Sequence, residues 1–314
     1  MPAMIEAENL TKYYGDFLGV QDVTFEVGKG EILGLLGPNG AGKTTTMRIL
    51  TGFMPPSSGS ARIAGFDATT QSLEARKHIG YLPETVPLYV DMTVSDYLGY
   101  MGILRGMQRS NVAARIPDVI RMCRLEEYRD SHISKLSKGY RQRVGIAQAI
   151  LHEPEVLILD EPTIGIDPIQ VVETRQLIRE LGGKNTVVLS SHILPEVSMV
   201  CDRIIIIHEG RVVAIDTPAK LSEQLQSTQR VEVEIRGPSP EVMPVLRGLQ
   251  GVQDVRRSGD EEISNYVIEA RRGGDLREQV ASLVVEHEWG LLRLQAVEMS
   301  LEEIFLRLTT PEGE

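Results

Sequence analysis

A glycine-rich stretch, residues 37–45, has the residue types and spacing of a loop that holds phosphate groups. It reads GPNGAGKTT and lies between an apolar strand-like run and a helical one, which is the context that the pattern G-x-x-x-x-G-K-[ST] requires. Glycines let successive backbone N–H groups point into one concavity, and the following helix N-terminus adds partial positive charge. A glycine-rich turn with a chance Lys-Thr is the alternative, and the flanking elements disfavour it. The predicted phosphate-binding residues are Gly37, Pro38, Asn39, Gly40, Ala41, Gly42, Lys43, Thr44 and Thr45.

Within this loop, two side chains carry specific chemistry. Lys43 is predicted to reach the β- and γ-phosphates of a nucleotide, and the Thr44 hydroxyl to be a ligand of Mg²⁺. Two carboxylates far downstream, Asp160 and Glu161, directly follow four apolar residues. A buried strand that ends in acids delivers them to the edge where open α/β sheets bind ligands. We expect Asp160 to hold Mg²⁺ and Glu161 to orient or deprotonate a water that attacks the γ-phosphate; a solvated acidic turn is the alternative.

A third motif lies at residues 136–140, LSKGY, ahead of an amphipathic helix. Ser137 is a natural helix cap and Gly139 permits close approach of the backbone, so this helix start is a second anion site. Nothing nearby in the sequence fills it. Here the chain resembles the ATP-binding subunits of ABC transporters, whose LSGGQ signature it matches at Leu136, Ser137 and Gly139.

The resemblance covers roughly residues 3–220, with the further motifs in family order. It implies that Tyr14 stacks on adenine, although Tyr13 beside it is the alternative. It also implies that Asp167 belongs to the D-loop and that His192 is the switch histidine. Residues 80–84 stand at the Q-loop and end in Glu84, which we expect to ligate Mg²⁺ or a water. The alternatives are that Asp167 is an acidic residue of an ordinary turn and that His192 is a loop histidine without a role in catalysis.

Two departures from the family pattern point to one branch of it. Glu84 replaces the Q-loop glutamine, while Lys138 and Tyr140 replace Gly and Gln of the signature. Ser137 and the Gly139 N–H, which carry the family's γ-phosphate contacts, are kept. Lys138 either adds a charge-assisted contact to the phosphate or points to solvent. These departures, and the ending SLEEIFLRL, resemble a prokaryotic exporter-type branch that includes drug-export, sodium-export and gliding-motility subunits.

The elements that must position these residues follow from hydrophobic patterning. Short apolar runs predict buried strands of a parallel sheet, and a stretch from 93 to about 135 opens with a capping-box-like Thr-Val-Ser-Asp and predicts an inserted helical subdomain. The expected fold is α/β, a P-loop ABC ATPase core with that insertion. The predicted strands are 31–36, 156–159, 186–189 and 203–207, and the helix after the phosphate loop is 45–50.

Charge and patterning change near residue 220. Residues 221–314 contain ten arginines, no lysine and eighteen acids, a net charge of −8 out of −11 for the chain. We therefore expect an ABC ATPase domain at 1–220 and a C-terminal accessory or regulatory domain at 221–314. The order β-α-β-β-α-β-(α) predicts a small α+β, ferredoxin-like fold for it. Its expected strands are 231–236, 252–257, 266–271 and 291–297, its helices 240–249, 276–287 and 300–308, and its polar turn 258–265.

Composition excludes several classes of protein. A net charge of −11 disfavours binding to DNA, so no nucleic-acid partner is expected. Two cysteines far apart are no disulfide framework, and no Cys/His cluster has zinc spacing. No apolar run approaches the roughly 20 residues that span a bilayer, and the N-terminus lacks the features of a signal peptide. The chain is expected in the cytoplasm, peripheral on the cytoplasmic face of the cell membrane through another protein.

The resemblance implies an ATP-binding and ATP-hydrolysing subunit of a membrane exporter. In the family, the signature helix caps ATP held by a second subunit, so two chains sandwich two ATP molecules head to tail. The expected partners are a separate membrane permease and a second copy or a related ATPase subunit. One alternative is a soluble ABC-type ATPase acting on nucleic acid or ribosomes without a permease. The other is an interaction module with a degenerate ATP site, which intact Lys43, Asp160, Glu161 and His192 disfavour.

Overall fold

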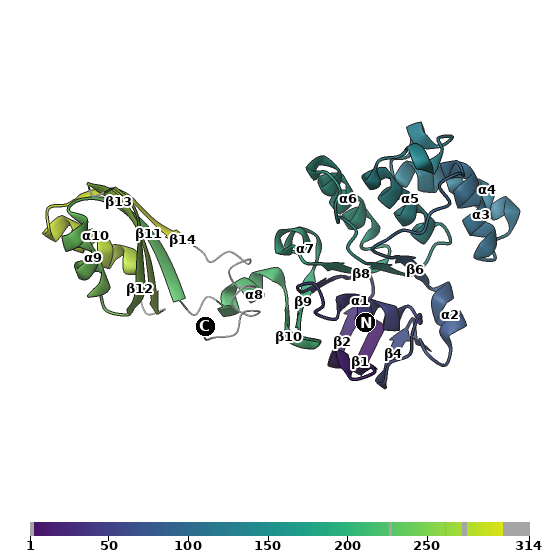
Figure 1. The fold of residues 1–314 in the computed structure, drawn as a ribbon, viewed down its shortest axis with the longest axis horizontal. Coiled ribbons are helices and arrows are strands. Elements are labelled where there is room, and N and C mark those ends of the chain that lie inside the picture. The colour runs from purple at the N-terminus through teal and green to yellow at the C-terminus, as the bar shows by residue number, and fades with distance from the viewer. Residues whose placement is uncertain (1–2, 226–227, 261, 272–274, 298–314) are drawn as a thin grey trace. The chain divides into compact units, whose positions relative to one another are not determined.

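The computed structural model describes residues 3–225, 228–260, 262–271 and 275–297 (Figure 1). By contacts the chain divides into two compact units, Met1–Pro218 and Ala219–Glu314. The helix predicted over 300–308 lies outside the described residues.

The first unit is built on a six-stranded sheet of order β10-β9-β3-β8-β7-β6. All neighbours are parallel except β9 and β10. Every residue of the central strands β3, β7 and β8 is buried, as expected where both faces of a parallel sheet are covered. The strands are β3 (Ile32–Leu36), β6 (Ile79–Leu82), β7 (Val156–Leu159), β8 (Thr186–Ser191), β9 (Arg203–His208) and β10 (Arg211–Asp216).

The four strands predicted for this sheet are present, with three differences at their ends, one of which is that β9 continues one residue further, to His208. Glu31 was expected in the first strand but closes the turn before it, because its backbone N–H donates to Gly28 O and its carboxylate accepts from Gly28 N. Strand β8 continues two residues beyond the prediction, to Ser191. The extension matters because it carries Ser190 and Ser191 to the edge of the sheet where the loops gather.

A second, antiparallel sheet of order β2-β1-β4-β5 was not predicted. Its apolar face packs with α1 and the main sheet into one core, in which Ile5, Val23, Met47 and Ile205 are fully buried. Helix α1 lies between the two sheets in Figure 1. The elements are β1 (Ala3–Tyr14), β2 (Phe17–Gly28), α1 (Lys43–Leu50), β4 (Ser58–Ile63), β5 (Phe66–Asp67) and α2 (Ser72–Lys77).

The predicted helical insertion consists of two helices and two single 3₁₀ turns. Thr93 caps the first helix by accepting from Asp96 N at 3.1 Å, and its hydroxyl donates to Asp96 Oδ2 at 2.7 Å, as the capping-box pattern predicted. Ser137 caps the signature helix and accepts from Tyr140 N. The elements of the insertion are α3 (Val94–Leu104), α4 (Arg109–Met122), η1 (Glu126–Tyr128) and η2 (Ile133–Lys135). The helices that follow it are α5 (Lys138–Ile150), α6 (Pro168–Leu181) and α7 (Leu194–Val200).

The second unit has a four-stranded antiparallel sheet of order β12-β13-β11-β14. Its helices bury Val242, Leu246 and Val280 against one face of that sheet. The predicted turn 258–265 is shorter than expected, because Ser258 and Gly259 still pair with Asn265 and Ser264. The elements are β11 (Thr228–Arg236), α9 (Ser239–Arg247), β12 (Val252–Gly259), β13 (Ile263–Arg271), α10 (Leu276–Glu286) and β14 (Gly290–Val297), preceded by α8 (Pro218–Leu225).

Two further expectations concern the chain as a whole. In the described ranges, none of the helices is long and apolar enough to cross a membrane. Cys123 and Cys201 are both free thiols and both buried. Burial raises the pKa of the Cys123 thiol to about 12 and also raises that of Cys201. These cysteines are therefore part of the core and are poor nucleophiles.

Candidate active site

The glycine-rich loop joins β3 to α1 and lines a cavity of about 330 Å³. Gly42 has φ of 105°, and a Cβ there would lie 2.5 Å from Val20 Cγ1 and 2.8 Å from Gly19 O, so a larger residue would strain the backbone and clash. The loop backbone can thus turn directly into α1. The lining residues are Phe17, Gly19, Asn39, Gly40, Ala41, Gly42, Lys43, Thr44, Thr45, Glu84, Glu161 and Ile164.

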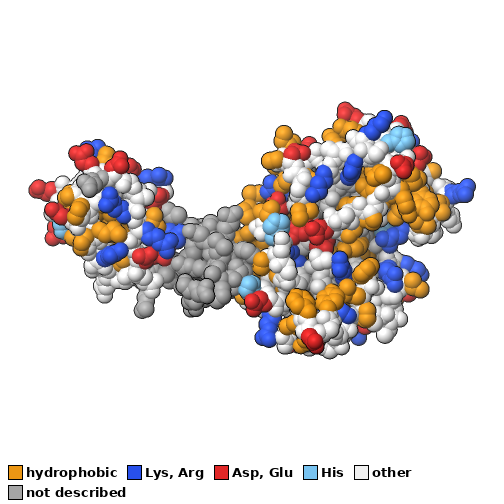
Figure 2. All heavy atoms as spheres, in the orientation of Figure 1, with side chains coloured by type: hydrophobic (Ala, Val, Ile, Leu, Met, Phe, Trp, Pro, Cys, Tyr) orange, Lys and Arg blue, Asp and Glu red, His pale blue; other side chains and the backbone are white. Residues whose placement is uncertain are grey.

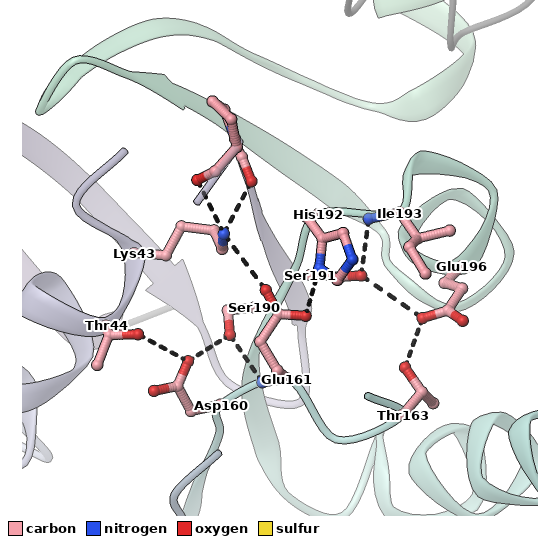
Figure 3. Close-up of polar contacts among 12 residues, drawn as sticks. Lys43, Thr44, Asp160, Glu161, Thr163, Ser190, Ser191, His192, Ile193 and Glu196 are labelled. Atoms are coloured by element: carbon pink, nitrogen blue, oxygen red, sulfur yellow. Dashed lines mark hydrogen bonds and ion pairs between the residues drawn. The ribbon is translucent and has the colours of Figure 1, made fainter. Parts of the chain in front are cut away.

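Lys43 is buried and held at the loop by three oxygen atoms. Its Nζ donates to Gly37 O at 2.8 Å and to Pro38 O at 3.2 Å, and lies 3.3 Å from Glu161 Oε1 (Figure 3). The lysine and the glutamate side chains are only 6% and 7% exposed. A buried ion pair of this kind keeps the ammonium beside the loop without solvent. An anionic group that enters the cavity meets this charge directly.

Asp160 lies at the end of β7 and is 1% exposed. Its Oδ1 accepts from Ser190 Oγ at 2.6 Å and from Thr44 Oγ1 at 3.3 Å. Burial raises the pKa of this carboxyl, and the two hydroxyl bonds oppose that rise. A carboxylate desolvated to this degree is stabilised by a cation.

The donor set here suits Mg²⁺. Thr44 and Asp160 present hard oxygen atoms side by side, and Glu84 lines the same cavity. In the part of the chain that the structure describes, no group of three His, Cys, Asp or Glu side chains could hold a metal by itself. Mg²⁺ normally completes its shell with water and substrate phosphates, so a hydroxyl and one or two carboxylates beside a phosphate loop fit it.

Glu161 follows Asp160 and is the centre of the site. It is 5% exposed and has φ of 48°, a left-handed conformation that is uncommon outside glycine. Its backbone N–H donates to Ser190 Oγ at 2.9 Å. Its Oε2 lies 2.9 Å from His192 Nδ1, while Oε1 faces Lys43 (Figure 3). The carboxylate therefore joins the phosphate-loop lysine to the histidine after β8.

The signature residues do not lie in this cavity. Ser137 Oγ accepts from Gln170 Nε2 at 3.4 Å, and a Cβ at Gly139 would be only 1.3 Å from Gln170 Oε1. Asp167 caps α6 by accepting from Gln170 N at 3.1 Å. Among the described residues, Ser137, Lys138, Gly139 and Asp167 are absent from the lining of the cavity. Ser137, Gly139 and Asp167 all lie against Gln170, whereas Lys138 lines an adjoining hollow with Glu84 and Ile164.

The predicted adenine-stacking residue lies at the edge of the site. Tyr14 is 42% exposed, and its hydroxyl is 3.3 Å from Thr45 Oγ1 and donates to Met54 Sδ. The aromatic side chain that lines the cavity is Phe17, which is 66% exposed and stands two residues after the turn at Gly15. Tyr14 thus neighbours the phosphate loop, and its role in stacking stays a prediction.

Three residues that the sequence reasoning did not assign make hydrogen bonds at the site. Ser190 bonds to both Asp160 and Glu161, while Thr163 donates to Glu196. The sequence signal for Ser190 was weak: two serines that end a buried strand before the predicted switch histidine. No pattern in the sequence pairs Thr163 with Glu196.

Comparisons with known proteins agree with this geometry. A family model described as "ABC transporter" matches residues 20–164. The linearmycin resistance ATP-binding protein LnrL of Bacillus subtilis (strain 168) is 35% identical over 98% of both chains. The Nod factor export ATP-binding protein I of Cupriavidus metallidurans (strain CH34) is 32% identical over 99% of both. A solved structure described as the ATP binding subunit of an ABC transporter is 34% identical over 70% of this chain and 92% of its own, with a TM-score of 0.63.

Proposed function

The chain belongs to the ATP-binding subunits of ABC transporters and is an ATPase, and from this premise we propose that two copies enclose two ATP molecules head to tail and drive a membrane exporter. ATP binding energy closes the pair, because the nucleotide makes its second set of contacts only in the closed state. Hydrolysis removes those contacts and opens the pair. The permease converts this cycle into transport.

The observation that carries the proposal is the separation of two half-sites in one chain. The phosphate loop and Glu161 line one cavity, and Asp160 adjoins it through its bond from Thr44, while Ser137 and Gly139 lie outside the cavity at the start of α5. The start of α5 has a capping serine and a glycine that lets the backbone come close to a ligand, so it can bind an anion. A nucleotide bound in the cavity of the same chain would not supply that anion. A second subunit that presents its γ-phosphate to Ser137 completes both half-sites at once.

In this mechanism each residue acts on the phosphate chain or on the attacking water. Backbone N–H groups of the loop and Lys43 bind the β- and γ-phosphates. Mg²⁺, held by Thr44 and Asp160 with Glu84 beside them, supplies positive charge against the phosphate oxygens when bound. The incoming γ-phosphate competes with Glu161 for Lys43, and Glu161 then accepts the proton of the water. His192 orients that carboxylate through its Nδ1 contact.

An export role and a separate permease rest on the relatives and on the surface of the helical part. One relative that matches over nearly its whole length is named for Nod factor export. Hydrophobic side chains gather over the helical part in Figure 2. Tyr100, Ile103 and Leu104 on α3, and Tyr89 in the segment before it, are all more than 40% exposed. We assign this surface to the permease, which would place the subunit on the cytoplasmic face of the membrane.

For the C-terminal unit we propose a ferredoxin-like accessory domain that stabilises or regulates the dimer. The order β11-α9-β12-β13-α10-β14 and the sheet order β12-β13-β11-β14 support this fold. If the domain acts on the dimer, removal of residues 221–314 changes ATP-dependent dimerisation or the ATPase rate. An unchanged rate and an unchanged dimer would contradict the regulatory role.

The central test is Glu161→Gln in the full chain. The variant keeps the shape of the side chain and loses the proton acceptor, so we expect ATP binding to persist and hydrolysis to fall by about 10²- to 10⁴-fold. The ATP-bound closed dimer should then accumulate, measured by light scattering with and without Mg-ATP. Exposed Glu180→Gln is the matched control and should dimerise only transiently.

Two outcomes would contradict the proposal in different ways. Unchanged hydrolysis in Glu161→Gln would remove Glu161 from its role. Strict monomers under saturating ATP would remove the head-to-tail dimer. Co-purification from detergent-solubilised membranes identifies the permease, whereas persistent isolation with ribosomes or DNA would replace the exporter by a nucleic-acid ATPase.

A further inference from the structure

Three segments of the first unit meet at one carboxylate oxygen that the mechanism above does not use. Glu196 lies in the first turn of α7, and its Oε2 accepts from Thr163 Oγ1 at 2.5 Å and from Ser191 Oγ at 3.5 Å. The Ser191 hydroxyl also accepts from Ile193 N at 3.0 Å. Figure 3 shows Glu196 and Thr163 to the right of Glu161 and His192, with Ser191 next to His192. A single oxygen thus joins the loop after β7, the end of β8 and α7.

The position of this group along the chain is the reason it matters. Thr163 is two residues after Glu161, and Ser191 is one residue before His192. Thr163 and Ser191 are therefore separated from Glu161 and His192, respectively, by at most about 7 Å along the chain. We propose that Glu196 is a positioning residue for ATP hydrolysis, which holds these two loops together so that His192 Nδ1 and Glu161 Oε2 stay in contact; this rests on the roles proposed above for Glu161 and His192.

The backbone at Glu161 requires support from its surroundings. A non-glycine residue at φ of 48° is held there only where neighbouring contacts over-determine it. Ser190 Oγ accepts from Glu161 N and secures the near side of the turn. The bond from Thr163 to Glu196 secures the far side. Without it, the turn relaxes and the carboxylate moves away from the histidine.

Because the hydroxyls of Thr163 and Ser191 are buried, both depend on the Glu196 oxygen as their acceptor. Thr163 is 8% exposed and Ser191 is 2% exposed, so water does not readily replace a lost acceptor. Both hydroxyls donate, and both use the same oxygen of Glu196. The requirement is therefore for an acceptor at that point in space, and a neutral amide oxygen meets it as well as a carboxylate does. This distinguishes positioning from an effect of the negative charge.

The experiment compares variants of Glu196 in the full chain by steady-state ATPase kinetics. Glu196→Ala should lower kcat by between about ten- and a hundredfold, because the two side chains lose their alignment. The KM and the Kd for ATP should stay within about twofold, because the phosphate loop is untouched. Glu196→Gln should restore most of kcat. Ser198→Ala is the matched control on the same helix, since Ser198 Oγ donates only to Leu194 O, and it should behave as the unaltered chain.

A second variant keeps the test decisive if Glu196→Ala does not fold. Thr163→Val keeps the shape of the side chain, removes the donor and should lower kcat with the same unchanged KM. The double variant with Glu196→Ala should be no slower than Glu196→Ala alone, because the two act through one contact.

Several results would overturn the inference. They are full kcat in Glu196→Ala or in Thr163→Val, a loss in Glu196→Gln as large as in Glu196→Ala, or a rise of KM that accounts for the whole loss. A failure of the role proposed for Glu161 is told apart from these results by a separate measurement, because it appears as unchanged hydrolysis in Glu161→Gln.

Discussion

Replacing Ser190 by alanine tests how the site is held together. Ser190 is fully buried, donates to Asp160 Oδ1 at 2.6 Å and accepts from Glu161 N at 2.9 Å. A hydrogen bond to a charged group contributes about 1.5–3 kcal/mol and a neutral one about 0.5–1.5 kcal/mol. In the alanine variant the buried Asp160 carboxylate also loses one of its two hydroxyl donors. We therefore expect the folded first unit to lose about 3 kcal/mol of stability.

The expected loss corresponds to a measurable change in thermal unfolding. For a unit of this size, about 3 kcal/mol lowers Tm by roughly 6–12 °C. Circular dichroism follows the helices of both units, whereas the chain's one tryptophan, Trp289, packs in the second unit, and its fluorescence is an internal reference. We expect the unfolding of the first unit, followed by circular dichroism, to move to a lower temperature. The unfolding of the second unit, followed by Trp289 fluorescence, should stay unchanged. Ser198→Ala, whose hydroxyl bonds only within its own helix, is the control.

A Tm within about 2 °C of that of the unaltered chain would refute this reasoning. A shift that small corresponds to a loss of stability below roughly 0.5–1 kcal/mol. Such a result would mean that water or a rearranged loop replaces the serine at no cost, and that Asp160 and Glu161 are held by the strand alone. A fall in ATPase rate without a fall in Tm would likewise separate catalysis from the stability argued here.

The remaining predictions concern buried groups away from the site. Burial, with the charge of Arg105, lowers the pKa of His152 to about 4, so the folded chain favours its neutral imidazole. Stability is therefore lost as pH falls below the unfolded value near 6.5, and between pH 7 and pH 5 the unaltered chain should lose about 2 kcal/mol more than His152→Gln in urea unfolding; equal losses would contradict this. Burial raises the pKa of Cys123 and Cys201, so neither thiol should react with an aromatic disulfide reagent until the chain unfolds, and prompt labelling of the folded chain at pH 8 would show that the core opens.

The chemistry of the site was readable in the sequence where one short segment carries a whole function. The phosphate loop needs glycines, a lysine and a hydroxyl in one turn, so its composition alone predicts its shape at Gly42. The same holds for Asp160 and Glu161, which stand at the end of a four-residue apolar strand. The antiparallel sheet of β1, β2, β4 and β5 was missed, because its long strands have mixed burial and frequent register shifts that blur a period of two.

The sequence by itself thus predicted which residues bind phosphate, metal and water, and determined where the charge and patterning of the chain change near residue 220. Only the tertiary structure decided how they combine. Strand β8 lies between β3 and β7, so Ser190 comes to the side of Asp160 although 30 residues separate them. The same sheet order brings Lys43 to Glu161 and leaves Ser137 outside the cavity. Local patterns encode the type of each strand, whereas strand order follows from how all the apolar faces are buried together, and no short segment contains that information.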